Sequence, residues 1–256
     1  MKDLEFALGL ADAADELSLA RFRSLDLEVE TKPDRTPVTD ADRAVERRLR
    51  ELISDHRPQD AVIGEEFAND VAASREWIID PIDGTANFLR GIPIWATLIA
   101  LRIDGELVLS VVSAPALGRR WWARTGGGSF TRDIGGETRE LKVSSVASLA
   151  DSYVSYNSIQ QWQQIGLGSQ IVKLSEKVWR TRAFGDFLSY MYVAEGIIDA
   201  ASEPDLKIYD IAALVPIVRE AGGTFTGLHG ELEEKTSVVL ATNGNIHEAM
   251  RAALGS

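Results

Sequence analysis

Apolar residues recur at helical spacing in two segments near the start of the chain. Residues 3–23 carry them three and four positions apart, a spacing typical of an amphipathic helix. A second helix is expected to begin near Thr39–Asp40, because Thr39 is a favourable N-cap with Asp42 three residues on. Its buried stripe would be formed by Val45, Leu49, Leu52 and Ile53.

Short apolar runs follow these helices and predict strands. The runs cover residues 61–64, 76–79, 96–103, 106–114 and 119–123. Asp104–Gly105, between the third and fourth runs, is typical of a hairpin turn, and Gly126–Gly128 ends the pattern. The first half of the chain is therefore expected to form two helices over an antiparallel sheet.

The pattern changes near residues 143–145, after which expected strands alternate with expected helices. The strands are 153–156, 178–182, 197–201 and 238–241, and the helices are 168–177, 185–196, 209–221 and 245–254. Such alternation is typical of an α/β layer. The predicted fold class is α/β overall, with an α+β N-terminal half at 1–145 and an α/β C-terminal half at 146–256.

The chain has 256 residues and a formal charge of −12, from 39 acidic and 27 basic residues. Such a surface repels nucleic-acid phosphates and anionic lipids, so we expect no nucleic-acid or membrane partner. If the substrate is phosphorylated, a bound metal ion is the natural source of local positive charge. The absence of cysteine excludes disulfides and thiolate zinc sites. The N-terminus lacks a signal-peptide pattern, so a cytoplasmic location is expected.

Acidic residues stand where apolar strands end. Glu65 follows the run 61–64, Asp80 follows 76–79, and Asp83 comes three residues later. Two carboxylates held this close repel each other unless a cation lies between them, and Mg²⁺ prefers such oxygen ligands. Taken singly, Asp80–Pro81 or Asp83–Gly84 is better interpreted as an ordinary turn.

The residues after Asp83 suit an anion. Gly84 lets the backbone approach a ligand, and Thr85 is expected to open a helical turn whose N–H groups could bind phosphate. Metal ligands followed directly by a phosphate cradle are what a metal-dependent phosphatase needs.

Longer segments carry a specific family resemblance. Residues 77–88 (WIIDPIDGTANF) resemble the first signature of the inositol monophosphatase family, and residues 209–213 (YDIAA) with 220–223 (EAGG) resemble its second. Residues 64–66 (GEE) and Thr39–Asp40 fall in the expected order. The resemblance covers essentially the whole chain and implies a layered αβαβα sandwich. Tyr209 stands where the family often has Trp, a change expected to affect packing only.

The resemblance also implies a role for each matching residue. Two or three Mg²⁺ ions would be held by Glu65, Asp80, the Ile82 carbonyl, Asp83 and Asp210. Thr85, hydrogen-bonded to Asp40, would orient the attacking water with help from Glu65, and these three residues would be catalytic. The implied reaction is in-line hydrolysis by a metal-activated water. The family is commonly dimeric, so a homodimer is expected.

The substrate-facing segment is expected at residues 182–190. Gly185, Asp186, Phe187 and Tyr190 resemble the histidinol-phosphatase branch of the family, as do residues 119–123 (RRWWA). An acidic residue there would complement the ammonium and imidazole of histidinol phosphate. The implied substrate-binding set is Gly84, Thr85, Gly185, Asp186, Glu203 and Asp210. Asp186 could instead simply cap the helix that follows.

The resemblance therefore implies Mg²⁺-dependent hydrolysis of L-histidinol phosphate in histidine biosynthesis. One alternative is the same chemistry on inositol 1-phosphate or another small sugar phosphate. A remote alternative is a catalytically idle relative used for binding or regulation. The idle alternative is disfavoured because an idle relative would usually lose at least one of Glu65, Asp80, Asp83, Thr85 and Asp210, and all are present.

Overall fold

The computed structural model describes residues 2–31, 37–233 and 235–255. Its N-terminal sheet has seven strands in the spatial order β3-β4-β5-β6-β7-β8-β9, which is also their order in the chain. The strands are β3 (Ala61–Gly64), β4 (Arg75–Asp83), β5 (Ala96–Ile103), β6 (Glu106–Ala114), β7 (Arg119–Arg124), β8 (Ser129–Asp133) and β9 (Arg139–Glu140). The sheet is antiparallel as predicted except at its edge, where β3 runs parallel to β4.

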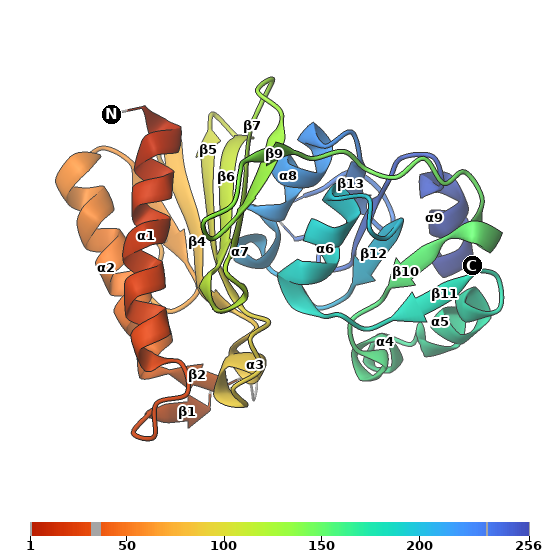
Figure 1. Cartoon of the computed structure of the whole chain (residues 1–256), viewed down its shortest axis with the longest axis horizontal. Helices are drawn as coiled ribbons and strands as arrows, with labels where there is room; N and C mark the ends of the chain where they lie inside the picture. Colours follow the sequence, from red (N-terminus) through yellow and green to blue (C-terminus); the bar gives the residue numbers. More distant parts are fainter. Residues whose placement is uncertain (1, 32–36, 234, 256) are drawn as a thin grey trace.

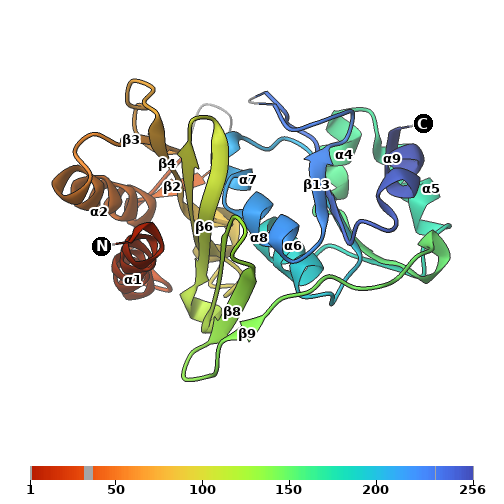
Figure 2. The same cartoon turned by 90° about the horizontal axis from the view of Figure 1, so that it is seen from above.

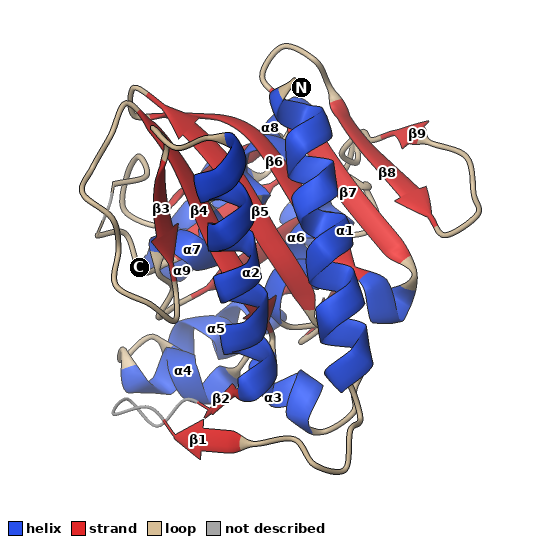
Figure 3. Cartoon of the chain, turned by 90° about the vertical axis from the view of Figure 1, so that its left-hand side faces the viewer, coloured by secondary structure: helices blue, strands red, loops and turns tan. Residues whose placement is uncertain are grey.

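Helices α1 (Asp3–Arg21) and α2 (Asp40–His56) lie side by side across one face of this sheet (Figure 3). α2 begins at the predicted cap, where the Asp42 N–H donates to Thr39 Oγ1 at 3.3 Å. Apolar side chains of both helices pack against buried sheet residues such as Trp77 and Ile99. Burying this apolar face supplies the main driving force for the arrangement.

A second layer of helices lies between the two sheets (Figures 1 and 2). It comprises α6 (Asp186–Ala194), α7 (Ile208–Ile211) and α8 (Leu214–Glu220). The sequence predicts one helix over 209–221, but the structure has two. In a continuous helix the Pro216 nitrogen would have to donate to the Ala212 carbonyl, which proline cannot do.

The C-terminal sheet has five strands in the order β11-β10-β12-β14-β13. They are β10 (Tyr153–Ser155), β11 (Arg180–Arg182), β12 (Ala200–Glu203), β13 (Thr224–Gly227) and β14 (Val239–Thr242). β10 is parallel to both of its neighbours, whereas β14 is antiparallel to β12 and β13. β13 is not predicted from the sequence, since its four residues contain one large apolar side chain, follow two glycines and end in a third.

Helices α4 (Ile159–Gln164), α5 (Gly168–Ser175) and α9 (His247–Gly255) cover the outer side of the second sheet (Figure 1). The layers therefore run helix, sheet, helix, sheet, helix, as the family resemblance implied. The remaining elements are β1 (Val29–Thr31), β2 (Pro37–Thr39), α3 (Thr85–Leu89) and the 3₁₀ helices η1 (Pro115–Leu117) and η2 (Leu149–Asp151). Among the described residues, no helix combines the length and the apolar character that a membrane crossing requires.

Candidate active site

A β-bulge in β4 brings the first two acidic residues together. Asp80 and Asp83 are three residues apart on β4, but their partners on β5, Leu98 and Ala96, are two apart. Because side chains alternate between the faces of a strand, one extra residue turns Asp83 to the same side as Asp80. Pro81 lies within the bulge and has no N–H to give to the ladder. The strand thus continues through Asp83, where the sequence predicts a turn.

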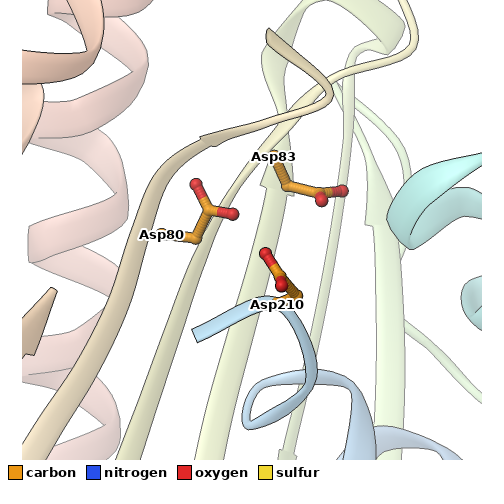
Figure 4. Close-up of side chains that lie close together, drawn as sticks. All are labelled: Asp80, Asp83 and Asp210. Atoms are coloured by element: carbon orange, nitrogen blue, oxygen red, sulfur yellow. The ribbon is translucent and has the colours of Figure 1, made fainter. Parts of the chain in front are cut away.

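Asp210 of α7 completes a cluster with these two side chains. One carboxylate oxygen from each of Asp80, Asp83 and Asp210 lies within 4.8 Å of the other two, and Figure 4 shows the three side chains converging. Asp210 Oδ2 also accepts the Lys207 N–H at 2.6 Å, which fixes the start of α7. The cluster joins β4 of the first sheet to a helix of the middle layer.

Burial and mutual repulsion make this cluster electrostatically unfavourable without a cation. Burial is the largest cause of the raised pKa of Asp80, followed by the charges of Glu65 and Asp83. Burial likewise raises the pKa of Asp83, and it raises the pKa of Asp210 to about 7. Either protons or a metal ion must relieve such a group of carboxylates, and carboxylate oxygens are the hard donors that Mg²⁺ prefers.

Glu65 approaches the same cluster from the neighbouring strand. It follows Gly64, the last residue of β3, which is in register with Ile79 immediately before Asp80. After burial, its charge contributes to the raised pKa of Asp42, of Asp80 and of Asp210. Of the expected ligands, Asp80, Asp83 and Asp210 therefore lie together, and Glu65 lies near enough for its charge to act on two of them.

The partner of Thr85 is Asp42, and the prediction of Asp40 is wrong. The Thr85 hydroxyl lies 3.1 Å from Asp42 Oδ1 and 3.0 Å from the Ile82 carbonyl oxygen. Asp40 instead forms an ion pair with Arg21 at 2.8 Å, away from the cluster.

The geometry of α2 explains the difference. Residues three and four apart share one face of a helix, so Asp42 lies on the buried stripe with Val45 and Leu49, and all three are fully buried. Asp40, the first residue of α2, is one-third exposed. The signal for Asp42 was present in the sequence, in the register of the apolar stripe.

Gly84 is required here by both conformation and space. Its φ of +85° lies in the left-handed region, where a Cβ is unfavourable. A Cβ would also come within 3.2 Å of the Asp186 carboxylate. Asp186 therefore approaches the segment that follows the acidic cluster, from the other half of the chain.

Asp186 does not cap the helix that it opens. The N-cap residue of α6 is Gly185, which has no side chain to form a cap. Asp186 Oδ2 instead accepts a hydrogen bond from the Asn87 amide at 2.9 Å. The cap comes from the cluster instead, since Asp83 Oδ2 accepts the Phe187 N–H at 2.8 Å. Burial raises the pKa of Asp186 to about 6.

Glu203, the last residue of β12, lies close to Asp186. It is 5% exposed and accepts a hydrogen bond from the Asn157 amide. Burial raises its pKa, and the neighbouring charge of Asp186 adds to the effect. Sequence reasoning missed Asn87 and Asn157, because their partners are 99 and 46 residues away and nothing local marks them.

Comparisons with known proteins find high similarity to two enzymes and to a solved structure. The chain is 51% identical to the histidinol-phosphatase of Mycobacterium tuberculosis over 99% of this chain and 98% of that protein. It is 48% identical to the histidinol-phosphatase of Streptomyces coelicolor over 98% and 96% of the two chains. The solved IMPase of Thermotoga maritima superposes with a TM-score of 0.89, at 30% identity over 100% and 97% of the chains. A sequence profile of the inositol monophosphatase family matches residues 2–256, and the protein belongs to that family.

Proposed function

We propose that this protein is a Mg²⁺-dependent phosphatase that hydrolyses L-histidinol phosphate to L-histidinol and phosphate in histidine biosynthesis. The observation that carries the proposal is the approach of a carboxylate, Asp186, to Gly84 beside the candidate metal site. The high identity to two histidinol-phosphatases supports the same substrate.

The donor set fits Mg²⁺. Asp80, Asp83 and Asp210 offer three clustered carboxylate oxygens, and Glu65 and the Ile82 carbonyl are proposed as further oxygen donors. Two or three ions would be held by these residues. Bound Mg²⁺ would neutralise the phosphate charge and lower the pKa of the attacking water.

Thr85 and Asp42 are proposed to orient that water. When the Thr85 hydroxyl donates its single proton to Asp42 Oδ1 at 3.1 Å, its lone pairs are free to accept a hydrogen bond from the water. Glu65 can then receive the proton that the water loses. In the overall reaction water attacks phosphorus, the ester P–O bond breaks, and the leaving alkoxide gains a proton.

Substrate choice is assigned to the far side of the site. Asp186, which approaches Gly84, and Glu203, whose pKa is raised in part by the charge of Asp186, would face the ammonium and imidazole of histidinol phosphate. Neutral inositol gives two buried carboxylates no charged partner, so it is expected to bind less well.

A phosphate-release screen tests the proposal. Histidinol phosphate, inositol 1-phosphate, fructose 1,6-bisphosphate and adenosine 3′,5′-bisphosphate are compared with Mg²⁺ and with a chelator. We expect the highest kcat/KM for histidinol phosphate, and no release with the chelator. A preference for inositol phosphate would refute the substrate assignment, and no release from any compound would favour the idle alternative.

The assembly and organisation belong to the same proposal. We assign a cytoplasmic homodimer and two halves, 1–145 and 146–256, from the family resemblance and the sequence pattern. Light scattering after gel filtration measures the oligomeric state, and a monomeric mass would contradict the dimer.

A further inference from the structure

One fully buried carboxylate has no part in the roles assigned above. Asp42 and Glu46 lie four residues apart on the same face of α2, and both are fully buried. A buried charge needs close partners to offset its desolvation. Asp42 finds them in Thr39 and Thr85, so the partners of Glu46 indicate what its charge is for.

Those partners are backbone N–H groups of the loop that carries Glu65. Glu46 Oε2 accepts the Glu66 N–H at 2.7 Å, and Oε1 accepts the Phe67 N–H at 3.3 Å. Arg50, one turn further along α2, donates to Oε1 at 2.8 Å. The Glu46 carboxylate thus holds the chain immediately after Glu65.

The same carboxylate also presses against the chain immediately before Glu65. A Cβ on Gly64 would lie 2.1 Å from Glu46 Oε1, far inside any permissible contact. The absence of a side chain at Gly64 therefore allows this close approach. The Gly64 N–H donates to Asn69 Oδ1 at 3.1 Å, which folds the loop back on itself. Glu65 is consequently fixed from both sides.

We propose that Glu46 is a positioning residue, which holds the backbone of residues 64–67 so that the Glu65 carboxylate faces the metal cluster. This role rests on the proposed function, because it takes Glu65 to be a metal ligand. α2 then supports the site twice, since Asp42 orients Thr85 and Glu46 places Glu65. A plain structural role, in which Glu46 only neutralises Arg50, predicts lost stability and nothing more.

Glu46→Gln separates the two roles. Glutamine keeps the shape, but it replaces one acceptor oxygen by an NH₂ donor. Since both Glu46 oxygens accept hydrogen bonds, one of them would then meet a donor. Gly64→Ala disturbs the same contact from the loop side. Glu76→Gln is the matched control. Glu76, on β4, is 7% exposed and pairs with Arg102 of β5 at 2.7 Å.

Three measurements are made on the full chain: Mg²⁺ affinity by titration calorimetry, kcat with the best substrate of the screen, and the melting temperature. We expect Glu46→Gln and Gly64→Ala to weaken Mg²⁺ binding and lower kcat by about 10- to 100-fold. Glu76→Gln should lower the melting temperature by an amount similar to that for Glu46→Gln. It should leave the Mg²⁺ affinity and kcat within about twofold of the wild-type values.

The outcomes distinguish this role from the proposed function. Normal Mg²⁺ binding and kcat in folded Glu46→Gln would overturn the positioning role alone. A different best substrate would refute only the substrate assignment, because the calorimetry uses Mg²⁺ without substrate. Absence of Mg²⁺ binding by the wild-type protein would overturn the proposed function and this role together.

Discussion

Asp83 is proposed as a metal ligand, yet it also caps a helix of the other half. One of its oxygens takes part in the cluster with Asp80 and Asp210, while Oδ2 accepts the Phe187 N–H at 2.8 Å. A carboxylate at a helix N-terminus also interacts favourably with the helix dipole. The orientation of α6, and with it Asp186, is therefore tied to the candidate metal site.

Asp42 and Asp40 offer a matched pair of variants. Asp42→Asn should lower kcat by about 100-fold, because Asp42 Oδ1 accepts from Thr85 and Oδ2 accepts from Thr39, and the amide replaces one of these acceptors by an NH₂ donor. It should also cost about 1 kcal/mol of stability, because Asp42 shares the capping box with Thr39. Asp40→Asn should leave kcat within about twofold. Steady-state kinetics on both variants measures this, and equal losses would contradict the assignment.

Asp186→Asn tests the proposed substrate preference. Asparagine tolerates the left-handed φ of +48° at this position but removes the charge. We expect kcat/KM for histidinol phosphate to fall by about 10- to 100-fold, since a hydrogen bond to a charged group is lost. Hydrolysis of inositol 1-phosphate by the same variant is the internal control and should hold or improve. A parallel loss on both substrates would show that Asp186 does not select between them.

At this scale, the acidic cluster could be predicted from the signatures, whereas Asp42, Asn87 and Asn157 were missed. Asp80, Asp83 and Asp210 lie in long motifs, and the structure brings them within 4.8 Å of each other. The predicted partner of Thr85, Asp40, lies two positions before the observed partner, Asp42. A motif match fixes the order of residues along the chain, but it does not fix the face of a helix on which each residue lies. No local sequence pattern marks Asn157, because the pairing of β10 with β12 brings it to its partner Glu203.

At the scale of elements, Glu220 of the second signature fastens one half to the other. From the end of α8 it accepts the Gly126 N–H and the Gly128 N–H, each at 2.9 Å. Both glycines have positive φ, +66° and +81°, in the turn between β7 and β8. The motif residue and the glycine run, 92 to 94 residues apart, therefore form one structural contact.

Glu220→Ala should accordingly affect stability and spare catalysis. The loss of two hydrogen bonds to a partly exposed carboxylate should cost about 1–3 kcal/mol, with kcat unchanged. Denaturant unfolding measures the difference. Glu248→Ala, which removes an exposed pair with Arg251 on α9, is the control and should change stability by less than about 0.5 kcal/mol. A reduced kcat in Glu220→Ala would instead place this contact in the function of the site.

The elements themselves were predictable where periodicity was long. α1, α2 and the strands β5 and β6 follow their apolar patterns closely, whereas β4 extends four residues beyond the predicted run 76–79. The bulge in β4 was not predicted, because Pro81 suits a turn and a bulge equally well. Nor was the break between α7 and α8, since the apolar pattern of 209–221 runs through it.

For the whole molecule, the site joins the two halves. β4 contributes Asp80 and Asp83, and α7 contributes Asp210. The carboxylates repel each other, so they lower the stability of the folded protein when no metal is bound. A bound cation would offset this repulsion. Stability is therefore expected to depend on pH and on Mg²⁺ together.

Without metal, stability should fall as pH rises from about 5 to about 8. The pKa of Asp210 is raised from 3.8 to about 7, and that of Asp186 from 3.8 to about 6, chiefly by burial. A raised carboxyl pKa means that the folded state holds the proton more tightly than the unfolded state does. The protonated group therefore stabilises the folded state fully below the ordinary pKa, and this stabilisation is lost as the pH rises through the raised pKa. Burial lowers the pKa of His247 below 6.5, so this residue favours the folded state as the pH rises. The two carboxylates together are expected to outweigh this single histidine.

Mg²⁺ should therefore raise the melting temperature more at about pH 8 than at about pH 5, where protons compete for the carboxylates. Thermal melts with chelator and with Mg²⁺ at both pH values measure the effect. Asp210→Asn should lose most of the Mg²⁺ shift at about pH 8, whereas Asp40→Asn should retain it. Equal Mg²⁺ shifts at the two pH values, or a full shift in Asp210→Asn, would show that the ion binds elsewhere. The carboxylate cluster would then have to be stable through protonation alone.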